Sequence, residues 1–228
     1  MRAALYFAPP RDAPLTRLAA EWLGRDAFTD EPTRAPDARL DPLVADPARY
    51  GFHATVKAPF RLAEGTGLDA LDAALARFAA EREAPTIGRL ALRRIDGFFA
   101  LVPAGAEPRL DALSADAVRR FAPFRAPLTP AEIERRRPSG LTERQRTYLG
   151  RWGYPYVFEE FRFHMTLTGR TGDAEAAELE PLLRARFREV VDGPLVIDAL
   201  VLFVEREPGA PFTVHSRHAL RPIALPVS

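Results

Sequence analysis

Two stretches of the chain repeat one pattern of residues that can handle phosphate chemistry. Residues 52–57 read Phe-His-Ala-Thr-Val-Lys, and residues 163–168 read Phe-His-Met-Thr-Leu-Thr. The two copies contain half of the four histidines in the chain, and the first contains its only lysine, Lys57. Two matched His/Thr pairs predict a two-fold arrangement of side chains around one anionic group.

Strand geometry would place the polar residues of each copy on one face. Side chains at positions i, i+2 and i+4 of a strand point to the same side, so the His, Thr and Lys of the first copy form one row. His164, Thr166 and Thr168 form the other row. The residues between them are apolar and would face the core. If the two halves pack with pseudo-two-fold symmetry, both rows line one cleft.

A cleft of this kind suits the opening of a phosphodiester. Because an unperturbed histidine has a pKa of about 6.5, one imidazole can take a proton from water while the other protonates the leaving oxygen. Such catalysis is typically worth ~10² to 10⁴-fold. We expect His53 and His164 in these roles, Thr55 and Thr166 on non-bridging oxygens, and Lys57 offsetting charge in the transition state. The sequence leaves open which histidine is the acid.

No metal or cofactor is expected in this scheme. Two histidines without neighbouring Asp, Glu or Cys make a poor zinc site. Cysteine is absent from the chain, which excludes a thiol nucleophile, a disulfide and a thiolate metal site.

Several aromatic residues are candidates for contacts with the substrate. Tyr6 could reach the cleft from the first strand, and core packing explains it equally well. Tyr50 could stack on a base or sugar beside the first motif, and Tyr154 and Tyr156 from the other side. Trp152 and Tyr154 could instead cap the core.

Outside the motifs, one charged residue is a candidate for contact with the phosphate, and two other groups are weaker candidates. Arg162 lies an even step from the second motif histidine, so it is a candidate third phosphate contact. The arginine run at residues 135–137 is typical of a solvated helix face. His215 and His218 fall on opposite faces of a strand, which favours a role at the surface or behind the site.

The elements that must position these residues occur in the same order twice. The first part of the chain predicts a strand at 3–8, a helix at 14–24, a surface loop at 30–50, the motif strand at 53–60, a helix at 68–82, and a hairpin at 87–102 that turns at Asp96-Gly97. A helix at 110–121 follows. The second part predicts the motif strand at 161–168, a helix at 174–190, and strands at 195–205 and 212–220. This order indicates a diverged internal duplication.

These elements predict an α+β fold, in which each lobe is a mainly antiparallel sheet with helices on its outer face. We expect residues 1–126 to form the first lobe, 127–156 a helical insertion, and 157–228 the second lobe. The two lobes would form one compact domain with a central cleft between them.

Composition limits the classes of partner. Among 228 residues, 32 basic and 31 acidic side chains give a formal charge of +1, which exerts no long-range pull on nucleic acid or acidic membranes. No apolar run approaches the ~20 residues of a membrane span, and the N-terminus does not resemble a secretory signal. We expect a cytoplasmic monomer or weak dimer that binds a small phosphorylated metabolite or nucleotide.

The duplicated motif resembles the signature of the two-histidine (2H) phosphoesterase superfamily. Its flanks, residues 50–60 and 152–164, look like the branch associated with bacterial phosphonate metabolism. The resemblance implies a bilobal α+β fold and metal-free opening or formation of a phosphodiester, commonly a ribose cyclic phosphate. By matching position it implies His53 and His164 as the acid–base pair and Thr55 and Thr166 as phosphate ligands.

Three readings of function follow. The leading one is a cyclic phosphodiesterase for a small ribose phosphate or nucleotide. The second is a phosphate- or nucleotide-binding module without turnover. The third is an RNA 2′,3′-cyclic phosphodiesterase or ligase, against which the near-neutral charge weighs because long RNA contacts need a basic surface.

Overall fold

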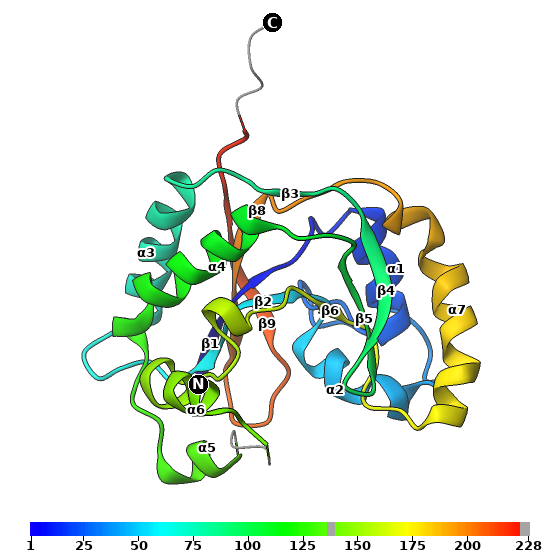
Figure 1. Ribbon diagram of the computed structural model, residues 1–228, viewed down its shortest axis with the longest axis horizontal. Coiled ribbons are helices and arrows are strands. Elements are labelled where there is room, and N and C mark those ends of the chain that lie inside the picture. The colour runs from blue at the N-terminus through cyan, green and yellow to red at the C-terminus, as the bar shows by residue number, and fades with distance from the viewer. Residues whose placement is uncertain (136–139, 224–228) are drawn as a thin grey trace, which may run out of the picture.

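A seven-stranded sheet forms the centre of the computed structural model, which describes residues 1–135 and 140–223 (Figure 1). The strand order is β4-β5-β6-β2-β1-β8-β9, and each neighbouring pair is antiparallel. The strands are β1 (Arg2–Phe7), β2 (Ala54–Phe60), β4 (Leu90–Ile95), β5 (Phe98–Pro103), β6 (Met165–Thr166), β8 (Ala199–Glu205) and β9 (Thr213–Ala219). A separate ribbon pairs β3 (Thr86–Ile87) with β7 (Leu195–Val196). The fold is therefore α+β with antiparallel sheets, as predicted.

The helices pack around this sheet in two groups. In Figure 1, α1 and α7 lie together at one end, and α3 and α4 lie at the other. The helices are α1 (Pro14–Leu23), α2 (Asp41–Tyr50), α3 (Leu68–Ala80), α4 (Pro108–Arg120), α5 (Pro130–Arg135), α6 (Glu143–Trp152) and α7 (Asp173–Val191), with 3₁₀ turns η1 (Ala122–Phe124) and η2 (Phe158–Glu160). None of the helices in the described ranges combines the length and the apolar character of a bilayer span.

Strands from the two ends of the chain interleave in the sheet. β8 and β9 continue the sheet beyond β1, whereas β6 is inserted between β5 and β2. The stretches 1–126 and 157–228 therefore each contribute strands to both halves of the sheet, and neither forms a sheet by itself. The order of elements along the chain does not reveal this exchange, because only pairing between distant strands decides it.

The predicted surface loop at 30–50 is wrong beyond residue 40, where α2 begins. Pro42 lies in the first turn, where a helix needs no N–H donor. Pro47 leaves the carbonyl of Leu43 without its partner in the helix, and the Gly169 N–H donates to that oxygen at 2.6 Å. Val44 and Pro47 are buried, so tertiary packing maintains a helix that the proline content argues against.

The hairpin between β4 and β5 is confirmed. Asp96 and Gly97 have φ of 48° and 92°, and two consecutive positive φ angles define the type I′ turn that matches strand twist. The second motif strand is shorter than the predicted 161–168, because the N–H groups of Leu167 and Thr168 both turn to the Phe99 carbonyl. The arginine run at 135–137 lies outside the described residues after its first member, which ends α5.

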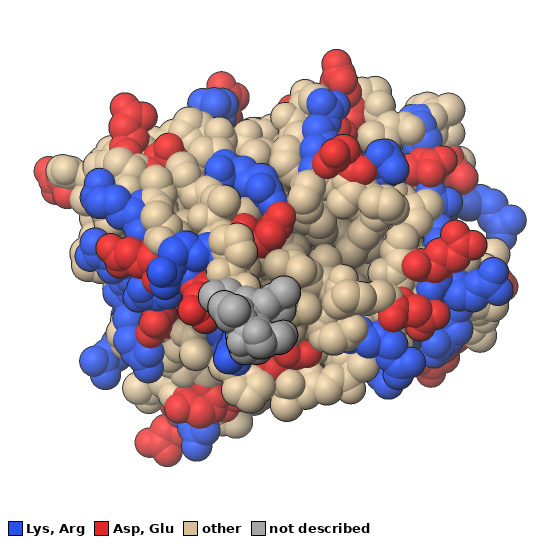
Figure 2. Space-filling view, turned by 90° about the horizontal axis from the view of Figure 1, so that it is seen from above, with Lys and Arg blue, Asp and Glu red and all other residues tan. Residues whose placement is uncertain are grey.

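Basic and acidic side chains alternate over the face shown in Figure 2. No continuous basic field covers this face, as the nearly balanced charge of the sequence predicts.

Glu205 joins three parts of the chain at the end of β8. Its side chain is 1% exposed, and its carboxylate accepts hydrogen bonds from both Arg2 and Arg49 and from the Gly209 N–H. Burial alone would raise the pKa of Glu205, but the bonds from Arg2 hold it below its ordinary value. The charged carboxylate therefore fastens β1 and α2 to the β8–β9 hairpin.

We predict that Glu205→Gln lowers the free energy of unfolding by about 3 kcal/mol, because one neutral amide cannot satisfy two partly buried guanidinium groups. Urea unfolding monitored by circular dichroism would measure the loss. The matched control is Glu207→Gln, whose side chain is exposed and which should stay within about 0.5 kcal/mol of wild type. Equal stability of the two variants would contradict the role of Glu205.

Candidate active site

The two motifs meet because β2 and β6 pair at a single position. Ala54 lies opposite Met165, and both side chains are buried in the core. Residues on either side of this pair point to the other face of the sheet. The antiparallel register sets Thr55 opposite His164 and Thr166 opposite His53. The pairing thus gathers two histidines and two threonines on one face.

His53 is fixed in one orientation by its own backbone. Its Nδ1 lies 2.8 Å from the carbonyl oxygen of Gly51, and its Nε2 lies 3.2 Å from Thr55 Oγ1. Because a neutral imidazole carries one N–H, donation from Nδ1 leaves Nε2 as the acceptor. Gly51 has φ of 74°, and a Cβ there would lie 2.4 Å from the Cβ of Ala27. Only glycine fits the bend that presents this carbonyl.

Aromatic rings cover the His53 imidazole on the side of β1. Tyr6, 1% exposed, stacks on it with ring centroids 3.7 Å apart and an interplanar angle of 20°. Tyr50 and Phe203 lie 6.3 and 6.1 Å from it. Burial lowers the pKa of His53 to about 4; the Gly51 hydrogen bond opposes this shift, and the charge of nearby His164 adds to it. His53 is therefore neutral near pH 7.

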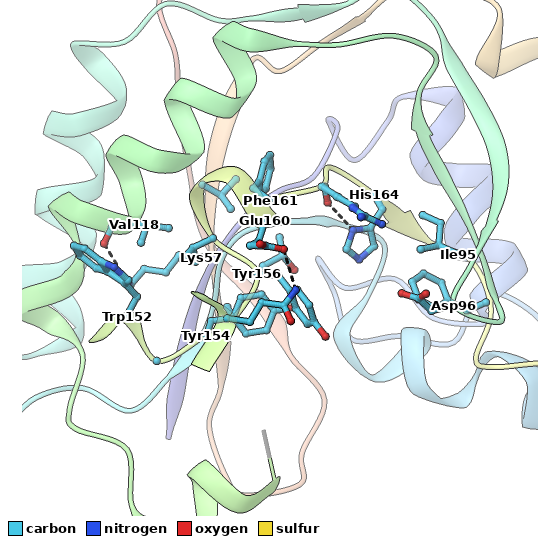
Figure 3. Close-up of a pocket in the computed structure, with 18 of the residues that line it drawn as sticks. Lys57, Ile95, Asp96, Val118, Trp152, Tyr154, Tyr156, Glu160, Phe161 and His164 are labelled. Atoms are coloured by element: carbon cyan, nitrogen blue, oxygen red, sulfur yellow. Dashed lines mark hydrogen bonds between the residues drawn. The ribbon is translucent and has the colours of Figure 1, made fainter. Parts of the chain in front are cut away.

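His164 repeats the backbone contact of His53 in different surroundings. Its Nδ1 lies 2.7 Å from the carbonyl oxygen of Arg162, again the residue two positions earlier. Its ring lies beside Phe98, 5.8 Å between centroids, and it faces a cavity (Figure 3). In each histidine the contact of Nδ1 with a backbone carbonyl thus orients the ring, and Nε2 points away from that carbonyl.

The cavity has a volume of about 410 Å³ and extends well beyond the histidines. The predicted site residues that line it are Thr55, Lys57, Tyr154, Arg162 and His164. Tyr156 and Trp152 also line it, and the Tyr154 and Tyr156 rings meet edge to face at 5.5 Å. The structure therefore brings both motifs and the aromatic run 152–156 to one cavity.

Five other predicted residues, of which Thr168 is described below, lie outside the cavity lining. His53 borders the cavity through Thr55, to which its Nε2 points. Tyr6 and Tyr50 lie behind His53 rather than in the cavity. Thr166 is partly exposed but is not among the lining residues.

Thr168 belongs to the scaffold, not to the cavity. It is 0% exposed, and its hydroxyl accepts a hydrogen bond from the Phe99 N–H at 2.9 Å and donates to the Gly169 carbonyl at 2.8 Å. With donor and acceptor both in use inside the core, this hydroxyl cannot reach a substrate. The prediction of Thr168 as a substrate contact fails because the strand ends before it.

Sequence reasoning missed several polar residues of the cavity. Arg125 follows η1, and its guanidinium donates to the carbonyls of Ala126 and Arg151. Gln145 on α6 donates to Glu160 on η2 at 2.9 Å, closing one wall. These residues occupy no repeated pattern, so the sequence offered no signal for Arg125, and for Gln145 only the polar character of the 127–156 stretch.

His218 lies in a separate cluster. Its Nε2 is 2.7 Å from the Asp72 carboxylate, which also accepts a hydrogen bond from Ser216. The cluster fastens α3 to β9 and does not line the cavity. Over residues 1–135 and 140–223, no three His, Cys, Asp or Glu side chains are grouped closely enough to hold a metal ion.

Comparison with known proteins places the chain in a family. Residues 55–213 match the family described as "Protein of unknown function (DUF1045)", and the chain belongs to this family. It is 40% identical over 226 residues to a ribose 1,5-bisphosphate phosphokinase PhnN of Janthinobacterium sp. (strain Marseille), with 95% of this chain and 50% of that protein covered. It is 38% identical over 218 residues to the protein of the same name from Laribacter hongkongensis (strain HLHK9), with coverage of 93% and 50%. The chain thus spans about half the length of the curated relatives it matches.

Two solved structures are similar at the level of overall shape. E. coli LigT complexed with NADP⁺ superimposes with a TM-score of 0.44 and 13% identity, covering 96% of this chain and 97% of that one. The TT0787 protein of Thermus thermophilus gives a TM-score of 0.45 and 15% identity, with coverage of 98% and 100%. Neither likeness is close enough to carry a functional role over to this chain.

The lowered pKa of His53 predicts a loss of stability in acid. The unfolded chain binds a proton at His53 near pH 6.5 and the folded chain only near pH 4, so the free energy of unfolding should fall by about 3 kcal/mol as the pH drops through this window. Urea unfolding at several pH values would measure it. His53→Gln should remove this part of the pH dependence, and His164→Gln should keep it. An unchanged slope in His53→Gln would contradict the assignment.

Proposed function

We propose that the protein is a metal-independent cyclic phosphodiesterase that hydrolyses a small ribose cyclic phosphate or a nucleotide-like phosphodiester. One observation carries the proposal. Two imidazoles lie directly before the paired strands β2 and β6, and each is oriented by a bond from Nδ1 to the carbonyl two residues earlier. This leaves two Nε2 atoms for proton transfer at one ligand, with a threonine beside each.

The surroundings of the two rings support a division of labour. His53, neutral at pH 7 because its pKa is lowered to about 4, is the base: its Nε2 takes a proton from the attacking water as the new P–O bond forms. His164 is the acid: its Nε2–H protonates the leaving oxygen as the ring P–O bond breaks. The product is a phosphate monoester with a free hydroxyl. Protons exchanged with solvent then reset both rings.

The other motif residues have supporting roles in this proposal. When the substrate binds, the Thr55 hydroxyl turns from His53 Nε2 to a non-bridging oxygen, and the Thr166 hydroxyl donates to another. Negative charge increases on these oxygens in the transition state. The Tyr6 ring holds His53 in plane from behind. Tyr154 and Tyr156 provide an aromatic wall for a sugar or base.

The relatives support a ribose phosphate as the substrate class and a place in phosphonate metabolism. Their name, ribose 1,5-bisphosphate phosphokinase, refers to proteins about twice as long as the matched stretch. The kinase activity itself is not part of the proposal. The only lysine of this chain, Lys57, follows Val56, so the sequence lacks the Gly-Lys pair of a phosphate-binding P-loop.

Substitution of either histidine tests the proposal directly. His53→Ala and His164→Ala should each lower kcat by about 10² to 10⁴-fold, because each removes a proton-transfer group. Phosphorus NMR would follow hydrolysis of 2′,3′-cyclic mononucleotides, ribose 1,2-cyclic phosphate and an RNA with a cyclic end, all in EDTA. His215→Ala, an exposed histidine, is the control and should retain activity.

The outcomes separate the three readings of function. Turnover of a small cyclic phosphate that both variants lose supports the proposal. Turnover confined to the RNA would favour the RNA enzyme. Binding without hydrolysis across the panel would leave only a binding module.

The acid limb of the pH–rate profile tests the role of His53. If His53 is the base, kcat/KM should fall only as the pH approaches about 4, because this parameter reports groups of the free enzyme. Stopped assays between pH 3.5 and 8 would measure the limb, with far-ultraviolet circular dichroism at each pH to confirm folding. A fall centred near the ordinary histidine value of 6.5 would assign the base elsewhere.

A further inference from the structure

Lys57 is buried at a distance from the proton-transfer groups. It is 4% exposed, and its ammonium group donates to the Val118 carbonyl at 3.3 Å. Figure 3 shows Lys57 beside Val118 and Trp152 at one end of the cavity, with His164 at the other. Burial, and then the charge of Arg125, lower the pKa of Lys57 to about 7. The mechanism above does not use this cation.

Arg125 provides a second cation at the same cavity. A Cβ at Gly153 would lie 2.8 Å from Arg125 Cδ and 2.9 Å from its Nε, so glycine at that position makes room for the guanidinium. Two of its nitrogens donate to backbone carbonyls. Its Nε is buried and has no partner in the described part of the chain. The Arg125 side chain therefore retains an unused donor.

No carboxylate neutralises these two cations within the described ranges. Neither Lys57 nor Arg125 forms an ion pair there. Glu132 acts on Arg125 only at longer range and is itself bonded to Arg61. The cavity is lined by four cations, Lys57, Arg125, Arg162 and Arg170, against two carboxylates, Asp96 and Glu160.

Lys57 is buried and Arg125 is partly buried, and each has carbonyl partners but, among the described residues, no carboxylate counter-ion. Removing a cation from water without a counter-ion is costly, and an anionic ligand would reduce that cost. We propose that Lys57 and Arg125 form a second anion subsite, and that the substrate is a cyclic phosphodiester carrying a second phosphate or phosphonate group. This inference rests on the proposed function. Thr55 and Lys57 line the same cavity of about 410 Å³. The proposal therefore places the second group on the same small sugar as the cyclic phosphate.

A binding measurement can report on the subsite without catalysis. Because Lys57 is the only lysine, lysine labelled with ¹³C at Cε gives a single side-chain NMR signal. Ribose 5-phosphate, which has no cyclic phosphate, should shift this signal saturably near pH 7 and raise the pKa of the amine. Arg125→Gln should weaken the binding at least about tenfold, whereas the exposed Arg188→Gln should not.

A ligand bound only at the histidine pair would move histidine signals and leave the Lys57 signal in place, which would overturn the subsite. So would a Lys57 shift that Arg125→Gln leaves unchanged. If Arg125→Gln fails to fold, calorimetry of ribose 5-phosphate binding to Lys57→Met provides the same test, with loss of binding expected and retained affinity contradicting the proposal.

Matched substrates test the consequence for turnover. Ribose 1,2-cyclic phosphate and adenosine 2′,3′-cyclic phosphate would each be assayed with and without a phosphate on C5. The bisphosphorylated member of at least one pair should have a kcat/KM about ten- to a hundredfold higher. Lys57→Met and Arg125→Gln should bring that ratio toward one, and Arg188→Gln should preserve it.

Failure of the subsite and failure of the proposed function give different results. Hydrolysis of both members at equal kcat/KM would remove the subsite and leave the phosphodiesterase. A saturable Lys57 shift without hydrolysis of any cyclic phosphate would keep the anion site and remove the phosphodiesterase. Neither shift nor hydrolysis would overturn both.

Discussion

The pairing of β2 with β6 is the constraint on which the candidate site depends. One residue pair, Ala54 with Met165, sets the register, and a slip of one residue would turn the imidazoles into the core. β6 is only two residues long, so its contact with β2 cannot hold the register alone. β5 fixes it from the other side through Leu101 opposite Met165, and Trp22 donates to the Leu167 carbonyl at 2.8 Å. The geometry of the site therefore depends on the contacts that β5 and Trp22 make around a very short strand.

This constraint explains why some polar residues near the motifs serve the scaffold. Thr168 continues the second motif in the sequence, yet its hydroxyl bonds the backbone where β6 ends. Gly169 then donates to the carbonyl that Pro47 leaves free in α2, which connects the end of the second motif to the helix preceding the first. A polar residue in a short motif can face a substrate or can bond the backbone of the scaffold. In this chain the point at which the strand ends decides which of the two it does.

Much of the fold and part of the site follow from local sequence. The first motif strand, the amphipathic helices and the Asp96-Gly97 turn depend on neighbours in the chain, and the sequence predicts them. The helix at 41–50 does not, because its prolines are tolerated only through a distant donor and a buried face. Arg125 is equally beyond local reasoning: it enters the cavity because Gly153, far along the chain, leaves room for it. Interleaving of the strands is likewise a property of long-range pairing.

A duplicated motif alone cannot assign different roles to its two histidines, since each follows a Phe and lies two residues before a Thr. In the folded protein they share one contact, from Nδ1 to the carbonyl two residues earlier, and differ in everything around it. Tyr6 stacks on His53 and burial lowers its pKa to about 4, whereas His164 faces the cavity. The backbone therefore orients the two imidazoles in the same way, and the side chains packed around them make their environments different. Pairing of the two motif strands therefore brings both imidazoles to one face of the sheet, and burial lowers the pKa of His53 through contacts that the repeated sequence does not encode.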